Sequence, residues 1–340
     1  WSVTCKRKAA PGTAMARTPA MGRRRKPPAG ARAICGWLNV DKPAGVSSAA
    51  AVARLRGALK PKRIGHGGTL DPLASGVLPV ALGEATKTVP YLMAGRKRYR
   101  FTVCFGERRD TDDAEGAVIE TSDERPDDAA IRGVLDRFSG DIRQVPPVYS
   151  ALKQDGRRAY DRARKGEAVN LAPRIVRVYE LRFTDRPDDD HAVFEVECGQ
   201  GFYIRALTRD LAAALGTVGY TSQLRRTRVG PFSEETAIPL ENLAAMGHSA
   251  RALKDLYPVE TVLDDIPALA VTGDQAAAMR QGRPIKVQCT GGPGPREAGA
   301  IAVSPKLSDG TVVCAMENGT LVALARYHAG QIRPVRVLNI

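Results

Sequence analysis

Residues 64–87 read Ile-Gly-His-Gly-Gly-Thr-Leu-Asp-Pro-Leu-Ala-Ser-Gly-Val-Leu-Pro-Val-Ala-Leu-Gly-Glu-Ala-Thr-Lys, a glycine-rich segment that runs into apolar sequence. The three glycines in its first half permit positive φ and a close approach of the backbone to a ligand. The apolar run 77–82 predicts a buried strand, in which the proline indicates an edge or an irregularity. His66 and Asp71 are therefore predicted to lie on a stiff loop beside a core strand, where catalytic residues are often found.

The residue types at Asp71 leave two interpretations open. Asp71 directly precedes Pro72, and an Asp before Pro is a common turn residue that accepts hydrogen bonds from nearby backbone amides. A single histidine such as His66 is likewise more often a loop or core residue than a catalyst. The other interpretation is that the carboxylate takes part in a reaction, with the imidazole beside it.

The complete string resembles the catalytic motif of the TruB family of tRNA pseudouridine synthases. The matching residues are Gly-Gly-Thr-Leu-Asp-Pro-Leu-Ala-Ser-Gly-Val-Leu-Pro with a preceding Gly-His, a long match nearly free of gaps. That family isomerises the uridine at tRNA position 55, in the T loop. The resemblance implies that Asp71 is the catalytic carboxylate and that His66 helps to position the flipped nucleotide.

The segment 97–105 alternates basic and apolar residues, which predicts a strand with one solvent-facing side. Tyr99 shares the apolar side with Phe101, so the pattern alone makes it a core residue. The Lys-Arg-Tyr at the start of this segment resembles the family's strand whose tyrosine stacks on the target base, which implies that role for Tyr99. Residues 220–228 resemble a further family segment, which implies that the backbone at Leu224 contacts the base.

Residues 199–207 read Gly-Gln-Gly-Phe-Tyr-Ile-Arg-Ala-Leu, a glycine-rich approach to a strand that is predicted to become a helix over 208–215. On one strand, Tyr203 and Arg205 would point to the same side because they are two residues apart. The stretch resembles the family's Gly-x-Tyr-Ile-Arg motif. The resemblance implies that Arg205 is the charged partner of Asp71 and that Tyr203 packs against the flipped base.

Two further segments resemble family motifs without indicating a catalytic residue. Residues 41–45 read Asp-Lys-Pro-Ala-Gly before two serines, a turn and a helix entry in which Lys42 is assigned no catalytic role. Residues 110–116 read Asp-Thr-Asp-Asp-Ala-Glu-Gly and resemble a structural loop near the family's active site.

Basic residues are concentrated between residues 150 and 177, where eight Lys and Arg stand against three Asp and Glu. Such a strip is typical of a surface that binds a phosphate backbone, although a solvated helix face has the same composition. The family places its RNA-gripping thumb insertion here, over about 140–175. The resemblance implies that the following side chains contact the RNA backbone: Lys153, Arg157, Arg158, Arg162 and Arg164.

Residues 1–35 are rich in Ala, Pro, Gly and Arg, have no hydrophobic period, and are predicted to be a disordered basic tail. Nine of the 51 Lys and Arg lie here without any acid, which leaves 42 basic against 37 acidic residues in the remainder. The tail therefore supplies most of the net charge of +14. The chain begins at Trp1, and Met21 is a candidate for the true start of translation.

The rest of the chain divides into two parts. From about residue 266 the pattern changes to short strands with one helix, which predicts a compact all-β unit. This unit is similar to the PUA-like β-barrel that ends many bacterial family members. We predict an α+β fold, in which a catalytic domain over 36–262 has a mixed, mostly antiparallel sheet flanked by helices, and a small PUA-like RNA-binding β-barrel occupies 266–340.

The six cysteines and four histidines are scattered without a Cys-x-x-Cys pair, so neither a zinc site nor a disulfide framework is predicted. No apolar run approaches the roughly 18 residues that a membrane span needs. We therefore expect a cytoplasmic protein that does not bind a membrane. No cofactor or metal is expected, because the isomerisation involves neither a redox nor a phosphoryl step.

The sequence thus predicts an isomerase that flips a uridine out of its stack, breaks the C1′–N1 bond, turns the uracil and joins C5 to C1′. Its expected partner is the T arm of tRNA, and the expected enzyme is a monomer with no obligate protein partner. The alternative is a non-catalytic tRNA-binding or folding protein. Asp71 with Arg205 favours the enzyme, since a binder needs neither. Modification within a guide-RNA complex is disfavoured, because no feature for binding companions is evident.

Overall fold

The computed structural model describes residues 30–150, 152–154, 157–164, 167–246, 254–289, 301–303 and 307–340. Residues 1–29 of the predicted tail, which include Met21, lie outside the described residues. The structure differs from the predicted end of the tail at residue 35. Ile34 is only 6% exposed and packs in the main core, and the backbone of Arg32 bonds to Lys60 and Lys62. One buried isoleucine produces no periodic pattern, so the sequence did not reveal this contact.

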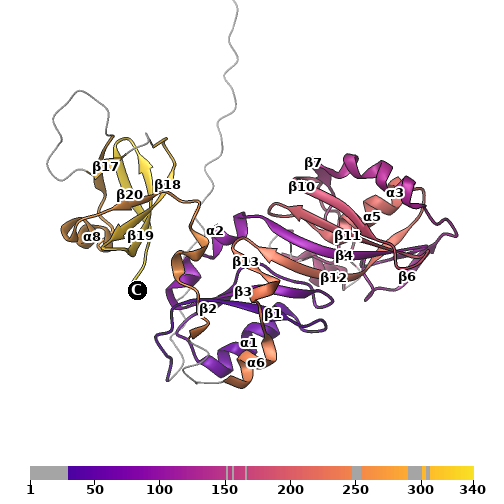
Figure 1. The fold of residues 1–340 in the computed structure, drawn as a ribbon, viewed down its shortest axis with the longest axis horizontal. Helices are drawn as coiled ribbons and strands as arrows, with labels where there is room; N and C mark the ends of the chain where they lie inside the picture. Colours follow the sequence, from indigo (N-terminus) through magenta and orange to yellow (C-terminus); the bar gives the residue numbers. More distant parts are fainter. Residues whose placement is uncertain are drawn as a thin grey trace, which may run out of the picture.

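A ten-stranded mixed sheet forms the larger part of the molecule (Figure 1). Its strands are β1 (Gly36–Lys42), β2 (Ile64–His66), β3 (Ser75–Leu82), β4 (Lys97–Phe105), β7 (Gly140–Gln144), β10 (Arg174–Asp185), β11 (His191–Cys198), β12 (Gly219–Val229), β13 (Phe232–Ser233) and β14 (Ile238–Pro239). The order is β14-β1-β3-β12-β4-β11-β10-β7, with β2 beside β3 and β13 beside β12. Only the β1–β14 and β3–β12 pairs are parallel. The prediction of an α+β fold with a mostly antiparallel sheet is confirmed. A separate hairpin pairs β5 (Glu107–Arg109) with β6 (Val118–Thr121).

Helices cover one face of the main sheet in two groups (Figure 1). The first group is α1 (Ser48–Leu59) with α6 (Leu240–Met246), which lie side by side near β1 and β2. The second is α3 (Asp128–Val134) with α5 (Ile204–Ala214), and α5 packs on β4 and β12. Within the described ranges, none of the helices is long and apolar enough to cross a membrane.

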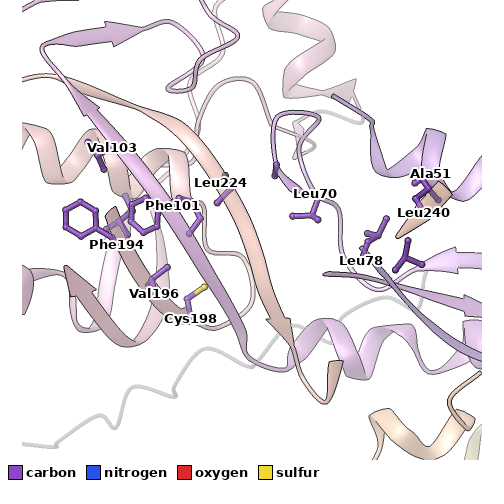
Figure 2. Packing of buried hydrophobic residues seen from close by; sticks show 14 of the residues in the cluster. Ala51, Leu70, Leu78, Phe101, Val103, Phe194, Val196, Cys198, Leu224 and Leu240 are labelled. Atoms are coloured by element: carbon purple, nitrogen blue, oxygen red, sulfur yellow. The ribbon is translucent and has the colours of Figure 1, made fainter. Parts of the chain in front are cut away.

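Buried side chains from both groups form one continuous hydrophobic cluster. Figure 2 shows its labelled members in two groups, with Phe101 and Phe194 in one and Leu78 in the other. Leu224 and Leu70 lie at the facing edges of these groups (Figure 2). The residue after Leu70 is Asp71, so the predicted site lies where the two halves of the core meet.

Local sequence explains where the helices begin and break. Ser47 caps α1, because its hydroxyl accepts a hydrogen bond from the amide of Ala50. Residues 83–94 form two short helices rather than one continuous helix. A 3-10 helix, η1 (Gly83–Lys87), is followed by α2 (Val89–Ala94). Pro90 lies in the first turn of α2, and a proline within a continuous helix would lack the amide proton that the helix needs.

A second, six-stranded sheet follows in the order β15-β18-β19-β20-β16-β17. Its elements are β15 (Ala268–Ala270), α8 (Gly273–Arg280), β16 (Ile285–Cys289), β17 (Ile301–Val303), β18 (Val312–Glu317), β19 (Thr320–His328) and β20 (Gln331–Val337). This sheet curls into a half-barrel. In the described part of the chain, β15 and β17 are its two edge strands. β16 was not predicted, because it alternates only a few apolar residues with Lys286 and Gln288. The Gly- and Pro-rich loop predicted over 291–295 lies outside the described residues.

The two sheets share a hydrophobic core. Trp37 of β1 and Val77 of β3 point away from the helices, and they pack in one cluster with Leu321, Leu324 and Leu338 of the second sheet and its end. Polar contacts join the same surfaces. The Nζ of Lys87 donates to the carbonyl of Val337 at 2.6 Å, and the amide of Asn339 donates to Glu84 at 2.9 Å. The second sheet is therefore packed against the first by both apolar and polar contacts.

We expect the shared core to make the two sheets unfold together. Leu324 is fully buried, so Leu324→Ala should cost about 2–5 kcal/mol through lost burial and a cavity. Differential scanning calorimetry should show one transition at a lower temperature, coincident with the change in the near-ultraviolet signal of Trp37. The control Val335→Ala alters a residue that is 36% exposed in β20 and should change stability by less than about 0.5 kcal/mol. A separate early transition that leaves the Trp37 signal unchanged would contradict the prediction.

Candidate active site

The loop that carries Asp71 connects β2 to β3, and every backbone carbonyl from residue 68 to residue 72 accepts a hydrogen bond. Two of these bonds come from Arg226, whose Nη2 donates to Gly68 at 3.1 Å and whose Nη1 donates to Thr69 at 3.4 Å. The others are Ser48 Oγ to Leu70 at 2.9 Å, the amide of Ala74 to Asp71 at 3.1 Å, and the amide of Gly45 to Pro72 at 2.8 Å. The loop is therefore held in place before any substrate arrives.

Two of the three glycines noted in the sequence are needed for this loop shape. Gly68 has a φ of +126°, which a side chain would strain. At Gly67 an added Cβ would lie 2.5 Å from a side-chain carbon of Leu92. Gly65 has open space and no positive φ, so the expectation of conformational freedom is not met there.

Asp71 forms the exposed end of a row of three charged side chains. Its Oδ2 lies 2.9 Å from Nη2 of Arg205, and the side chain of Asp71 is 36% exposed while that of Arg205 is 5% exposed. Behind Arg205 lies Asp113, with 3.3 Å between Nη1 and Oδ2. The guanidinium also donates to the carbonyls of Thr111 at 3.0 Å and Tyr149 at 2.9 Å. These partners fix the orientation of the guanidinium and, through it, of the Asp71 carboxylate.

The backbone at Tyr203 and Arg205 differs from the strand that was predicted. Tyr203 is the N-cap of α5 and Arg205 lies in its first turn, so the two residues do not alternate along a strand. The aromatic and β-branched residues at 202–204 favour a strand, but the turn before them starts the helix about four residues earlier than expected. The side chain of Gln144 holds this turn, because its Nε2 donates to the carbonyl of Tyr203 at 3.1 Å and its Oε1 accepts from the amide at 2.9 Å.

The two tyrosines and the histidine around Asp71 have pKa values shifted in the direction that favours their uncharged forms. Burial raises the pKa of Tyr99 on β4, and the nearby charge of Arg226 opposes this rise. Burial also raises the pKa of Tyr203. The negative charge of Asp71 is a smaller cause that raises the pKa of both Tyr99 and Tyr203. Burial first, and the charge of Arg226 second, lower the pKa of His66. Its Nδ1 is buried and has no hydrogen-bond partner in the described part of the chain.

The structure thus brings together most of the predicted site residues. Asp71 and Arg205 are in contact, and both tyrosines lie within reach of the charge of Asp71. Leu224 is 8% exposed on β12, where it pairs with Phe101 of β4, two residues from Tyr99. His66 ends β2 and pairs with β3.

The sequence did not single out several side chains that support this site. Lys42 is fully buried, and its Nζ donates to the carbonyls of Val46 at 2.6 Å, Pro43 at 2.9 Å and Pro72 at 3.4 Å. Burial, followed by the charge of Arg226, lowers the pKa of Lys42 to about 8. The segment around Lys42 was recognised only as a turn, and a lysine in a turn usually projects into water.

The predicted RNA-binding strip lies on a hairpin of β8 (Lys153–Gln154) and β9 (Arg157–Arg158) and on α4 (Ala159–Ala163). The side chains of Lys153 and Arg158 lie outside the described residues. Arg157 is 73% exposed, whereas Arg162 is 21% exposed and its Nε lies 2.8 Å from Glu167. Arg164 is exposed and stacks on the ring of Tyr160 at 4.3 Å. The three arginines whose side chains are described, Arg157, Arg162 and Arg164, therefore do not present equally accessible charges.

A cavity of about 550 Å³ lies apart from Asp71, lined by residues that include Arg96, Arg98, Tyr179 and Arg228. Arg96 and Arg98 both contact Glu197, at 3.0 and 2.8 Å, so this one carboxylate offsets part of their combined positive charge. Among the described residues, no group of three or more His, Cys, Asp or Glu side chains could hold a metal ion. The chemistry-bearing residues are therefore those around Asp71.

Comparisons with known proteins agree on one family. Residues 56–204 match the model of the N-terminal domain of TruB family pseudouridylate synthase, and residues 205–264 match that of the tRNA pseudouridylate synthase B C-terminal domain. The tRNA pseudouridine synthase B of Bradyrhizobium diazoefficiens is 52% identical over 91% of this chain and 87% of that protein. The protein of the same name from Caulobacter sp. strain K31 is 50% identical over 94% of this chain and 100% of that protein.

Solved structures with the same fold include an H/ACA RNP bound to a substrate RNA containing 2′-deoxyuridine. It matches with a TM-score of 0.67 and 26% identity, over 90% of this chain and 85% of that chain. A Cbf5–Nop10–Gar1 complex matches with a TM-score of 0.66 and 28% identity, over 89% of this chain and 84% of that chain. From these matches, and from the half-identical relatives above all, the chain belongs to the TruB family of pseudouridylate synthases.

Proposed function

We propose that this protein isomerises uridine to pseudouridine in tRNA, at position 55 of the T loop. The observation that carries the proposal is the pair of Asp71 and Arg205 at 2.9 Å, in which the carboxylate is partly exposed and the guanidinium is buried. Relatives named tRNA pseudouridine synthase B are 52% and 50% identical to this chain over most of its length. A protein that only binds tRNA would not need this pair, so the enzyme is favoured over a non-catalytic binder.

The proposed reaction begins when the target uridine leaves its stack and enters the space beside Asp71. Tyr99 stacks on the flipped base, Tyr203 packs against it, and the backbone at Leu224 contacts its edge. His66 offers its unpartnered Nδ1 to the nucleotide. Because the imidazole is neutral, it contributes hydrogen bonding rather than charge.

The chemical steps need no group beyond the protein and the RNA. When the C1′–N1 bond breaks, N1 keeps the bonding electron pair; the uracil then turns, and C5 forms a bond to C1′. C5 loses a proton and N1 gains one, so the atoms and the charge balance without an oxidant or reductant. Asp71 is the residue that acts on the reacting nucleotide, since a carboxylate can serve as nucleophile or as proton acceptor. Arg205 orients it.

We further propose that different segments of the chain have different roles. Residues 36–262 form the catalytic domain, the thumb over about 140–175 grips the RNA backbone, and residues 266–340 form a PUA-like RNA-binding domain. The curled half-barrel sheet supports the last assignment. The enzyme works as a cytoplasmic monomer on the T arm of tRNA.

Replacing Asp71 separates a catalytic carboxylate from a turn residue. Asp71→Asn keeps the shape and still accepts hydrogen bonds, so stability should change by only about 1 kcal/mol. We expect near-normal melting and tRNA binding, with pseudouridine formation on a T-arm stem–loop reduced by several powers of ten. Glu195→Gln is the matched control, because it neutralises a carboxylate that is paired with Arg100 at 3.1 Å away from the loop. The control should convert RNA at the parent rate. An Asn variant within about tenfold of that rate would show that Asp71 is a turn residue.

The thumb proposal is tested by the salt dependence of tRNA binding. Each phosphate contact that is lost should flatten the slope of log K against log [salt] by about 0.7–0.9. We expect Arg157→Ala and Arg164→Ala each to flatten it by nearly this amount. Arg162→Ala should have a smaller effect, because its guanidinium is 21% exposed and lies 2.8 Å from Glu167, whereas Arg157 is 73% exposed and lies 4.0 Å from the same carboxylate. If all three variants keep the parent slope in filter-binding titrations, the strip is only a solvated surface.

A further inference from the structure

Arg226 on β12 is a buried charge whose contacts are unlike those of Arg205. It is 1% exposed, and its Nε donates to the carbonyl of Val77 at 2.8 Å in addition to the two loop carbonyls of Gly68 and Thr69. Arg205 is neutralised by two carboxylates. Arg226 has no carboxylate within ion-pair distance among the described residues. Burying such a charge is costly, and three carbonyl dipoles offset that cost only in part.

The guanidinium of Arg226 touches both sides of the proposed site. Gly68 and Thr69 lie on the Asp71 loop, and Val77 lies on β3, the strand into which the loop leads. On the other side, Arg226 is the cross-strand partner of Tyr99 on the β12–β4 ladder, and its positive charge acts on the Tyr99 phenol, whose pKa it lowers against the effect of burial. One side chain therefore links the reacting carboxylate's loop to the aromatic ring on which the base would stack.

We propose that Arg226 is a positioning residue of this enzyme, which holds the Asp71 loop and the Tyr99 ring in one fixed relation. This inference rests on the proposed function, because it concerns the same reaction. A misplacement of about 1 Å between reacting groups can reduce a rate about 10²-fold, so a rigid link across the site has a direct effect on catalysis.

The charge of Arg226 has a second effect at the same place. It lowers the pKa of Lys42 and of His66, in each case as the cause second to burial. Its field therefore extends across the loop and the base pocket. When the C1′–N1 bond breaks, the electron pair on N1 makes the detached uracil negative until C5 bonds to C1′. A fixed cation behind the platform tyrosine favours that charge without reorganisation during the reaction.

The test is Arg226→Met, measured in three ways on the full chain. We expect the single-turnover rate at saturating tRNA to fall about 100-fold, while the tRNA affinity stays close to that of the parent. We also expect the pKa of His66 to rise toward its ordinary value, because a positive neighbour is removed. The His66 titration is followed by NMR; the chain has four histidines, and His66→Gln identifies the signal. Arg228→Met is the control, since Arg228 is an exposed arginine on the same strand, and it should leave the rate and the titration unchanged.

A second variant keeps the test decisive if the Met variant does not fold. Arg226→Lys retains the charge, but a single ammonium cannot reproduce the three directed hydrogen bonds of the guanidinium to Val77, Thr69 and Gly68. We expect the His66 titration to stay as in the parent and the single-turnover rate to fall about tenfold or more, short of the Met variant's loss. A Lys variant with the parent rate would overturn the proposed link. So would a folded Met variant that keeps both the rate and the His66 titration of the parent.

Failure of this inference is distinguishable from failure of the proposed function. If the parent protein forms no pseudouridine in a T-arm substrate, the proposed function is wrong, whatever the variants do. If the parent is active and the Arg226 variants are as active as the parent, the proposed function stands and the positioning role of Arg226 is wrong.

Discussion

The guanidinium of Arg205 is the point at which four separate segments of the chain meet. It leaves the first turn of α5 and contacts the loop before β3 at Asp71, the loop after β5 at Thr111 and Asp113, and the segment between β7 and β8 at Tyr149. Each contact removes freedom from a loop that has little regular structure of its own. Because the side chain is almost fully buried, its charge must be satisfied by all of these partners together. The arrangement of the site therefore depends on the folding of segments that are far apart in the sequence.

The main sheet uses its two faces differently. On one face, two groups of helices bury the apolar residues and meet where the Asp71 loop lies. On the other face, over β4 and β11, arginines and glutamates alternate in ion pairs such as Arg98 with Glu197 and Arg100 with Glu195. These pairs are partly exposed and contribute little stability individually. They keep this part of the sheet polar and leave the apolar packing to the face that carries the site.

The sequence predicted the site where a long local string carries it, and it failed where a contact depends on the fold. Asp71 could be found because the residues on both sides of it resemble a known motif. Lys42, Asp113 and Arg226 could not, because a charged residue in a turn or strand usually faces water and only the tertiary structure buries these three. The start of α5 was misplaced because local strand propensity was overridden by the preceding turn. The predicted end of the tail lies too far along the chain, because Ile34 is buried by residues that are distant in the sequence.

The core that joins the two sheets affects the order in which the chain can fold during synthesis. Trp37 lies near the beginning of the main sheet, yet part of its packing comes from Leu321, Leu324 and Leu338 near the other end of the chain. At about 5–20 residues per second, the ribosome needs roughly 15–60 s to make the intervening three hundred residues. Throughout that interval, the apolar side of β1 and β3 opposite α1 and α6 lacks the part of its packing that comes from the second sheet. Until the second sheet has been made, this apolar surface is exposed, and exposed apolar surface on an incomplete chain favours aggregation.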